Sequence, residues 1–161
     1  MDKRDFVFVV SLSYFNEPCY EDDQIRRLDD SLSCFEKFIN MESLPTEQNW
    51  YLLFNKANIL EEKIAKDIKF SDYYPAFSGR NDSVDDIYQF TLQEFMKRDK
   101  LGKIKNHFMV NVFKKEEVAE CIHKILRTDS LVNACFGNVL FGLGALKSPT
   151  IKKQQMAATK K

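Results

Sequence analysis

Trp50-Tyr51-Leu52-Leu53-Phe54 is followed directly by Asn55-Lys56-Ala57-Asn58. The first segment is wholly apolar, which is typical of a strand buried on both faces, as in parallel sheets covered by helices. The second segment is mostly polar and ends the apolar run abruptly. In open parallel sheets, ligands bind outside the carboxyl ends of the strands. This junction therefore predicts a parallel α/β fold and the edge at which a ligand site lies.

Two further segments are candidate strands of the same sheet. Residues 6–12 form a near-continuous apolar run, and residues 107–113 form a more polar one. Apolar residues at steps of three and four predict helices with one face turned to a core. These helices cover residues 22–40, 59–66, 84–95 and 118–126. Strands that alternate with helices predict right-handed crossovers and a parallel sheet with helices on both faces, and they place residues 55–58 and 111–114 at the same edge.

The composition excludes some classes of protein. The chain has 161 residues, of which 44% are hydrophobic and 14 are Phe, so it can form one domain with a sizeable core. Lys and Arg total 24, as do Asp and Glu, so the charge gives no argument for a nucleic acid partner. The four cysteines include no Cys-x-x-Cys pair and no signal peptide is recognisable, which predicts reduced thiols in an intracellular protein. Asp2 stands where N-myristoylation requires glycine, so the sequence shows no lipidation signal.

The C-terminal part differs in character from the rest. Residues 130–146 carry no charge and are rich in apolar side chains. A membrane-spanning helix is one interpretation, but such a helix needs about 20 apolar residues, and glycines and asparagines interrupt this segment. A buried helix end followed by a disordered tail is the alternative that we favour. We therefore expect a domain over residues 1–136 and an extended, disordered tail over residues 137–161.

Asn55-Lys56-Ala57-Asn58 differs at one position from the Asn-Lys-x-Asp motif with which GTPases bind guanine. In that motif the carboxylate accepts hydrogen bonds from two donors of the base, N1–H and the N2 amine. The Asn holds neighbouring loops, and the Lys stem covers the base. A match of this length is weak by itself. The alternative is an ordinary loop in which Asn58 caps a helix that begins at Ile59.

Further segments, in order along the chain, carry a family resemblance. Residues 55–64 continue the near-match with two apolar residues and Glu-Glu-Lys-Ile, and residues 21–35 contain an acidic turn and a helix similar to Arg-Met-x-Glu-Ser-x-x-x-Phe. Tyr74-Pro75-Ala76-Phe77-Ser78-Gly79 is similar to a Tyr-Pro-x-Tyr-x-Gly loop, and His107-Phe108 matches the start of a last strand. Together these motifs resemble heterotrimeric G-protein alpha subunits over residues 5–136.

The resemblance implies a partial Ras-like (P-loop GTPase) three-layer fold that lacks the family's N-terminal strands and phosphate loop. It implies G protein-coupled receptor signalling from the cytoplasm at the inner face of the plasma membrane, with GTP or GDP as ligand and GTPase activity. Asn55 and Lys56 would contact the guanine base, with Asn58 and Asn111 at the other base-binding positions. Asp30 matches an acidic residue that pairs with a switch arginine. The match supplies no catalytic residue and no ligand for the family's Mg²⁺.

The family's partners are a receptor and a beta-gamma dimer. Residues 116–140 match the last helix and tail, which such subunits present to receptors. The beta-gamma contacts come largely from an N-terminal helix and a switch region that the match does not include. The resemblance therefore implies receptor contact through the last helix and leaves the beta-gamma contact without residues in this sequence.

Two positions depart from the family's base-binding pattern. Asn58 replaces the Asp, and because an amide offers one acceptor and an NH₂ donor, one guanine donor is left unpaired. The cost is about 1–3 kcal/mol, or about 5- to 150-fold in affinity, and xanthine, with oxygen at position 2, suits Asn better. The second base-binding loop, Thr-Cys-Ala-Thr in the family, is replaced by Met109-Val110-Asn111-Val112. Its key contact is a backbone N–H, which this substitution retains.

The match to a phosphate-binding loop decides between two interpretations of the function. Phosphoryl transfer needs a glycine-rich loop with Lys and Ser or Thr. Residues 142–148 do not supply it, because Phe141 and Leu146 stand where the loop requires glycine. One interpretation is an alpha-subunit-like protein that binds GTP. The alternative is a catalytically inactive pseudo-GTPase, or a fragment, that acts only as a protein-interaction module. In both interpretations residues 6–12 form an apolar edge strand.

Overall fold

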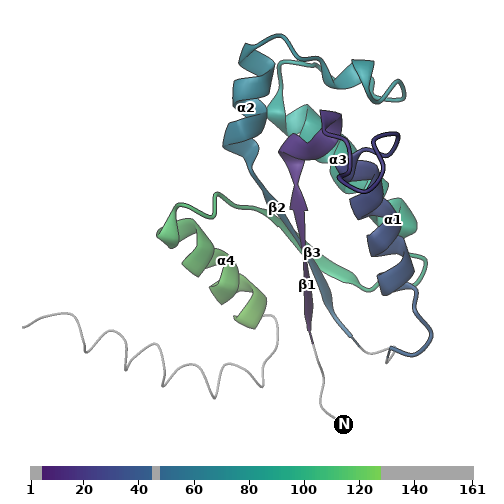
Figure 1. Cartoon of the computed structure of the whole chain (residues 1–161). Helices are drawn as coiled ribbons and strands as arrows, with labels where there is room; N and C mark the ends of the chain where they lie inside the picture. Colours follow the sequence, from purple (N-terminus) through teal and green to yellow (C-terminus); the bar gives the residue numbers. More distant parts are fainter. Residues whose placement is uncertain (1–4, 45–47, 128–161) are drawn as a thin grey trace, which may run out of the picture. The chain divides into compact units, whose positions relative to one another are not determined.

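The computed structural model describes residues 5–44 and 48–127 (Figure 1). Within these residues, strands alternate with helices in the order that the hydrophobic patterns predict. The elements are β1 (Phe6–Ser11), η1 (a 3-10 turn, Leu12–Asn16), α1 (Arg27–Ile39), β2 (Trp50–Asn55), α2 (Ala57–Ala65), η2 (a 3-10 turn, Phe70–Asp72), α3 (Val84–Arg98), β3 (Ile104–Met109) and α4 (Lys115–Arg127).

The strands form one parallel sheet in the order β1-β2-β3. At the carboxyl end of the central strand, Phe54 lies opposite Val10 of β1 and opposite Met109 of β3. The predicted parallel α/β class is therefore confirmed. Because all the strands run in the same direction, the loops that follow them emerge at one edge of the sheet.

Burial distinguishes the central strand from its neighbour. In β2, Tyr51 and Leu52 point to opposite faces and both are fully buried, as the wholly apolar sequence predicts. In β1 the burial alternates, and Val7 and Val9 are 47% and 57% exposed. β1 has a strand neighbour on one side only among the described residues, so it forms the apolar edge that the sequence predicts.

α1 and α3 pack on one face of the sheet through aromatic side chains (Figure 1). The Phe35 ring of α1 lies 5.1 Å from the Phe8 ring of β1 and 5.1 Å from the Phe95 ring of α3. The Phe95 ring in turn lies 5.9 Å from that of Phe54 in β2. Most of these pairs are edge-to-face, the arrangement that aromatic quadrupoles favour. The cluster holds two strands of the sheet against two helices.

α1 begins at Arg27, so the predicted helix start at residue 22 is wrong. Cys19 N–H donates to the Ile25 carbonyl at 2.7 Å. The Asp22 side chain accepts a hydrogen bond from Gln24 N–H at 2.9 Å, which forms a local turn. These bonds use backbone groups that a helix needs for its first turn. They leave Ile25, which the predicted apolar stripe includes, 43% exposed.

Other element bounds also differ from the prediction. β3 ends at Met109 rather than at residue 113, because the Asn111 side chain accepts a hydrogen bond from Phe113 N–H at 3.0 Å and turns the chain. α2 begins at Ala57 rather than at residue 59, and α4 at Lys115 rather than at residue 118. The first turn of a helix is often polar, so apolar spacing alone does not mark it.

α4 spans the boundary between two compact units, Met1–Cys121 and Ile122–Lys161. Glu116 and Glu117 lie in its first turn, where the helix dipole favours negative charge. Among the helices of the described ranges, none has the length and apolar character to cross a bilayer. The predicted alternatives for residues 130–146 and the predicted tail from residue 137 lie outside the described residues.

Candidate functional site

The carboxyl edge of the sheet brings together the two loops that the sequence singles out. Asn55, the last residue of β2, pairs with Ser11 at the end of β1. Directly after β3, Val110 N–H donates to the Phe54 carbonyl at 2.8 Å. Phe54 and Val110 are thus bonded to each other, and Asn55 and Asn111 are the residues that come directly after them. Their placement at one edge agrees with the sequence analysis, and their role in binding a base stays a prediction.

The Asn55-Lys56 turn is held by its own side chains. Asn55 Oδ1 accepts a hydrogen bond from Lys56 N–H at 2.6 Å. Lys56 has φ of 62°, a left-handed conformation that is uncommon outside glycine. This residue lies at the N-cap position of α2, so the strand passes into the helix within one residue. The turn thus places Lys56 directly after the end of the central strand and at the start of α2.

Lys56 reaches from this turn to Tyr14 in η1. Its Nζ donates to the Tyr14 hydroxyl at 2.7 Å and lies 4.2 Å from the centroid of the ring. The Arg27 guanidinium lies 3.7 Å from the same centroid. The hydrogen bond from Lys56 is the largest cause that lowers the pKa of Tyr14 below its usual value. Both cations thus lie within cation–π distance of the Tyr14 ring.

Lys63 of α2 anchors the same 3-10 turn. Its ammonium group donates to the Ser13 carbonyl at 2.7 Å, to Asn16 Oδ1 at 2.6 Å and to Glu17 Oε1 at 2.7 Å. The Lys63 side chain is only 15% exposed, so water competes weakly for these bonds. Two sets of contacts therefore join η1 to α2. One is the bond between Tyr14 and Lys56, and the other is made by Lys63.

Asn58 is the second residue of α2, so the alternative in which it caps a helix from Ile59 is wrong. The N-cap position belongs to Lys56, whose side chain makes no capping bond. The Asn58 side chain is half-buried and makes no hydrogen bond within the described part of the chain. Its amide is therefore available to a ligand at this edge, with one acceptor oxygen and one NH₂ donor.

The backbone N–H of Asn111 is already bonded to a side chain of α4. Glu117 Oε2 accepts a hydrogen bond from Asn111 N–H at 3.0 Å. Glu117 Oε1 lies 2.8 Å from Lys114 Nζ. The hydrogen bonds from Lys114 and from Asn111 N–H, in that order, lower the pKa of Glu117. The backbone N–H that the resemblance assigns to the base is thus engaged within the chain.

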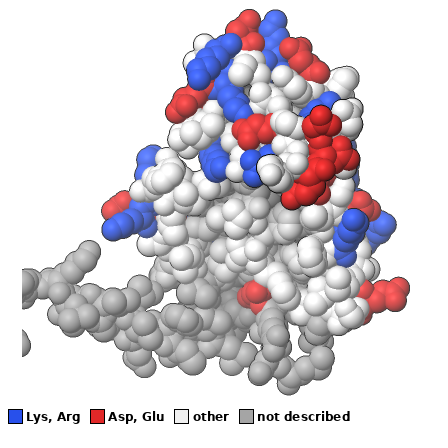
Figure 2. Space-filling view, viewed as in Figure 1, with Lys and Arg blue, Asp and Glu red and all other residues white. Residues whose placement is uncertain are grey.

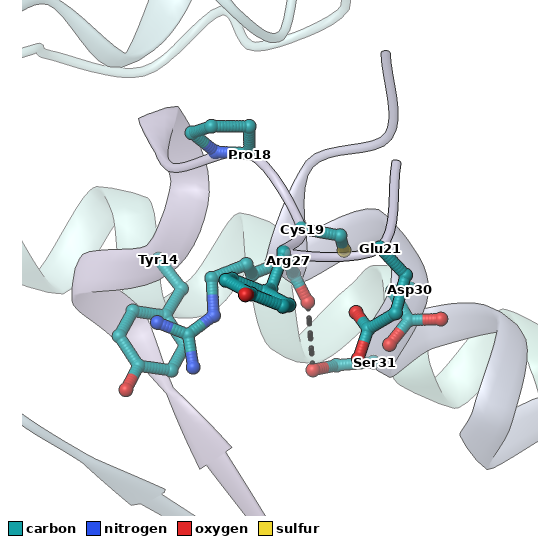
Figure 3. Close-up of a pocket in the computed structure, with 8 residues that line it drawn as sticks. Tyr14, Pro18, Cys19, Glu21, Arg27, Asp30 and Ser31 are labelled. Atoms are coloured by element: carbon teal, nitrogen blue, oxygen red, sulfur yellow. Dashed lines mark hydrogen bonds between the residues drawn. The ribbon is translucent and has the colours of Figure 1, made fainter. Parts of the chain in front are cut away.

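Asp30 lies apart from these loops, on α1. It lines a cavity of about 660 Å³ together with Tyr14, Pro18, Cys19, Tyr20, Glu21, Arg27 and Ser31 (Figure 3). Asp30 is exposed, and its Oδ1 lies 3.8 Å from Cys34 Sγ. Tyr14 belongs to both places, because it borders the cavity and binds Lys56. The predicted switch-facing role of Asp30 stays a prediction.

Charge and metal ligands add little to the site. In Figure 2, Lys and Arg side chains lie interspersed with Asp and Glu over the part of the face where α2 and η1 lie. Within residues 5–44 and 48–127, no three His, Cys, Asp or Glu side chains gather to hold a metal ion. His107 instead pairs with the Tyr88 hydroxyl at 2.6 Å, and burial lowers the pKa of His107.

Some functional candidates are absent from the sequence predictions. The sequence motif names Lys56 but not its partner Tyr14, and it does not distinguish Lys63 or Glu117 from other charged residues of their helices. Tyr14 could have been found, because it follows the first strand and so falls at the ligand edge of a parallel sheet. Glu117 could not, because its bond to Asn111 depends on where α4 begins.

Comparison with known proteins agrees with the resemblance. The family model of the G-protein alpha subunit matches residues 2–128. The guanine nucleotide-binding protein subunit alpha-12 of Rattus norvegicus is 28% identical over 123 residues, which cover 76% of this chain and 32% of that protein. The alpha-13 subunit of Mus musculus is 29% identical over 114 residues, which cover 70% and 30%. The alpha-1 subunit of Trichomonas vaginalis is 29% identical over 90 residues, which cover 56% and 22%.

The chain spans less than a third of the length of these relatives. The matched region nevertheless contains every described strand and helix, from β1 to α4. A parallel sheet with helices, matched over this region, is consistent with part of the Ras-like fold. The chain belongs to the G-protein alpha subunit family.

Proposed function

We propose that this chain provides the base-binding edge of a nucleotide-dependent signalling protein. One observation carries the proposal: the Asn55-Lys56 turn and the Asn111 loop lie side by side at the carboxyl edge of the parallel sheet. Ligands of open parallel sheets bind at this edge. The turn is held by the hydrogen bond from Lys56 N–H to Asn55 Oδ1, with Lys56 in a left-handed conformation. A base could therefore meet side chains that are already oriented.

Each residue has a distinct part in the proposed site. Asn55 holds the turn, and the Lys56 stem covers the face of the base. Asn58, whose amide is unpaired within the described residues, faces the edge of the base that distinguishes guanine from xanthine. Since one amide cannot accept from two donors, discrimination in favour of guanine is weak. We therefore expect this edge to bind xanthine nucleotides more tightly than guanine nucleotides, since the Asn58 amide can pair with both N1–H and O2 of xanthine.

The family supports further parts of the proposal. Receptor coupling through the last helix, association with a beta-gamma dimer, action at the inner face of the plasma membrane and GTP hydrolysis with Mg²⁺ are properties proposed for a protein of this family. Asp30, on the wall of the cavity in Figure 3, is proposed to face a switch segment. No residue of this chain is assigned to the hydrolysis step or to the metal.

A second candidate function is an interaction module that binds no nucleotide. The contacts of two groups favour it: Lys56 Nζ is bonded to Tyr14, and Asn111 N–H is bonded to Glu117. Both groups would otherwise be offered to a ligand. In this alternative the edge is stabilised by its own side chains, and the α1 and α4 surfaces serve protein partners only.

A titration of the 161-residue chain with labelled guanosine and xanthosine diphosphates separates the two functions. We expect saturable binding of both, and Lys56→Ala should weaken it about tenfold or more. Lys66→Ala is the matched control, because Lys66 is an exposed residue at the end of the same helix. Asn58→Asp should shift preference toward guanine by about 5- to 150-fold. Absence of binding in the high micromolar range would instead support the interaction module.

A further inference from the structure

Glu117 joins the start of α4 to the loop that follows β3. One carboxylate oxygen accepts from Asn111 N–H at 3.0 Å, and the other lies 2.8 Å from Lys114 Nζ. The Glu117 side chain is 41% exposed and that of Lys114 is 63% exposed, so the pair lies at the surface. The contact can therefore open without unfolding the sheet beneath it.

The loop itself is fixed on both sides of Asn111. Val110 N–H is bonded to Phe54 in the central strand at 2.8 Å, and Asn111 Oδ1 accepts from Phe113 N–H at 3.0 Å. Asn111 N–H thus keeps its position beside the end of β2 whether or not Glu117 is bound to it. A carbonyl oxygen of a bound base and the Glu117 carboxylate would compete for this donor. A carboxylate accepts a stronger hydrogen bond than a neutral carbonyl does.

We propose that Glu117 is a resident competitor for the Asn111 N–H and so lowers the affinity of this edge for purines that carry an oxo group at position 6. The inference rests on the proposed function, because it assumes that a base binds at the Asn55-Lys56 turn. A site that is blocked for part of the time binds its ligand more weakly in proportion to the open fraction. Glu117 is thereby a specificity-determining residue of the proposed site.

Glu117 also has a structural role that the test must separate. It is the third residue of α4, and a Glu at this position commonly reaches back to a free backbone N–H before a helix. Loss of this cap lowers stability without any effect on base selection. Removal of a negative charge near the site would also strengthen the binding of every nucleotide, whatever its base. A readout that depends on the base is therefore required.

The experiment measures the dissociation constants of labelled guanosine, xanthosine and adenosine diphosphates for the full chain and its variants. Glu117→Ala should tighten the binding of the two oxo-purines about three- to tenfold. Glu117→Gln keeps an acceptor oxygen but loses the charge, so its gain should be smaller. Adenosine diphosphate has an amine at position 6, so it should gain only what removal of the charge gives to every nucleotide. Glu116→Ala is the matched control, because Glu116 lies in the same turn and makes no bond to Asn111.

Each outcome decides the inference. A gain in affinity for guanine and xanthine nucleotides that adenosine diphosphate does not share supports the inference. This holds even if the wild-type chain binds no nucleotide and only Glu117→Ala binds one. In that case the proposed function of the unaltered chain is overturned. If the wild-type chain binds and Glu117→Ala binds no tighter, or tightens all three nucleotides equally, the inference is overturned and the proposed function stands. If neither the wild-type chain nor any variant binds, both are overturned.

Discussion

The two loops at the carboxyl edge of the sheet are held in different ways. The Asn55-Lys56 turn is fixed by a hydrogen bond between neighbouring residues and by contacts of Lys56 with Tyr14. The Asn111 loop is fixed by its own backbone, but its outward N–H is satisfied by Glu117, six positions further along the chain. The first loop keeps its conformation through short-range contacts, whereas the second has one donor that an exposed side chain can release.

This difference shows which part of the site can change. Contacts around the first loop involve partly buried groups such as Lys63, so opening them costs stability. The contact at the second loop joins the Asn111 backbone N–H to the Glu117 carboxylate, whose other partner is the exposed Lys114 side chain, and surface ion pairs contribute little to stability. We therefore expect variants around the first loop to affect folding as well as binding, and variants of the second loop to act mainly on binding.

The largest effect is expected where both loops depend on one residue. Phe54 is fully buried in β2, its ring lies 5.0 Å from Tyr88, and its carbonyl accepts from Val110 N–H. Phe54→Ala should lower the free energy of unfolding by about 3–5 kcal/mol, because it leaves a cavity beneath both loops. Chemical denaturation measures this loss. Met109→Ala is the control, since Met109 lies opposite Phe54 but is 44% exposed; an equal loss in both variants would contradict the prediction.

A smaller loss of stability is expected at the anchor of η1. Lys63→Met keeps the length of the side chain and removes three hydrogen bonds, to Ser13, Asn16 and Glu17. The free energy of unfolding should fall by about 1–3 kcal/mol, because partly buried acceptors lose their donor. Lys66→Met, at the exposed end of the same helix, should be nearly neutral. If the two variants were equally stable, η1 would not depend on this lysine.

The sequence predicts the first loop better than the second for a physical reason. The apolar run of β2 and the polar turn after it are local patterns, and the structure has the strand where it is expected with a turn directly after it, although α2 begins two residues earlier than predicted. The start of α1 is decided instead by the bond between Cys19 and Ile25, which no periodicity shows. The end of β3 is decided by the Asn111 side chain. Patterns of apolar residues thus predict which segments are buried, while single polar side chains decide where those segments begin and end.

The same limit applies to the candidate site. Asn55, Lys56 and Asn111 could be placed at one edge from the strand order alone. Their present partners could not, because Tyr14 and Glu117 become neighbours of the site only through the geometry of η1 and of the first turn of α4. The sequence therefore predicts where a base would bind and does not predict what holds the site in the absence of one.

A still smaller effect is expected from the hydroxyl of Tyr14. Tyr14→Phe removes the bond from Lys56 and leaves the ring within cation–π distance of Lys56 and Arg27, so stability should fall by less than about 1 kcal/mol. The pKa gives a sharper measurement. Because the Lys56 bond is the largest cause that lowers the pKa of Tyr14, Lys56→Met should return that pKa toward its ordinary value of 10.0. NMR of ring-labelled tyrosine follows it, and an unchanged pKa would show that Lys56 does not bind Tyr14 in solution.

The smallest effect on stability is expected at Glu117, and it depends on pH. Bonds from Lys114 and from Asn111 N–H lower the pKa of Glu117 below its ordinary value of 4.5. The charged form is therefore favoured in the folded state, so its contribution is complete above pH 4.5 and is lost as the pH falls through the lowered pKa. Unfolding midpoints of the wild-type chain and Glu117→Gln should differ near neutral pH and converge in acid. Glu116→Gln should show no such convergence, because Glu116 does not reach Asn111. A constant difference at all pH values would mean that the Glu117 carboxylate does not hold the second loop, and the contrast between the two loops would then be lost.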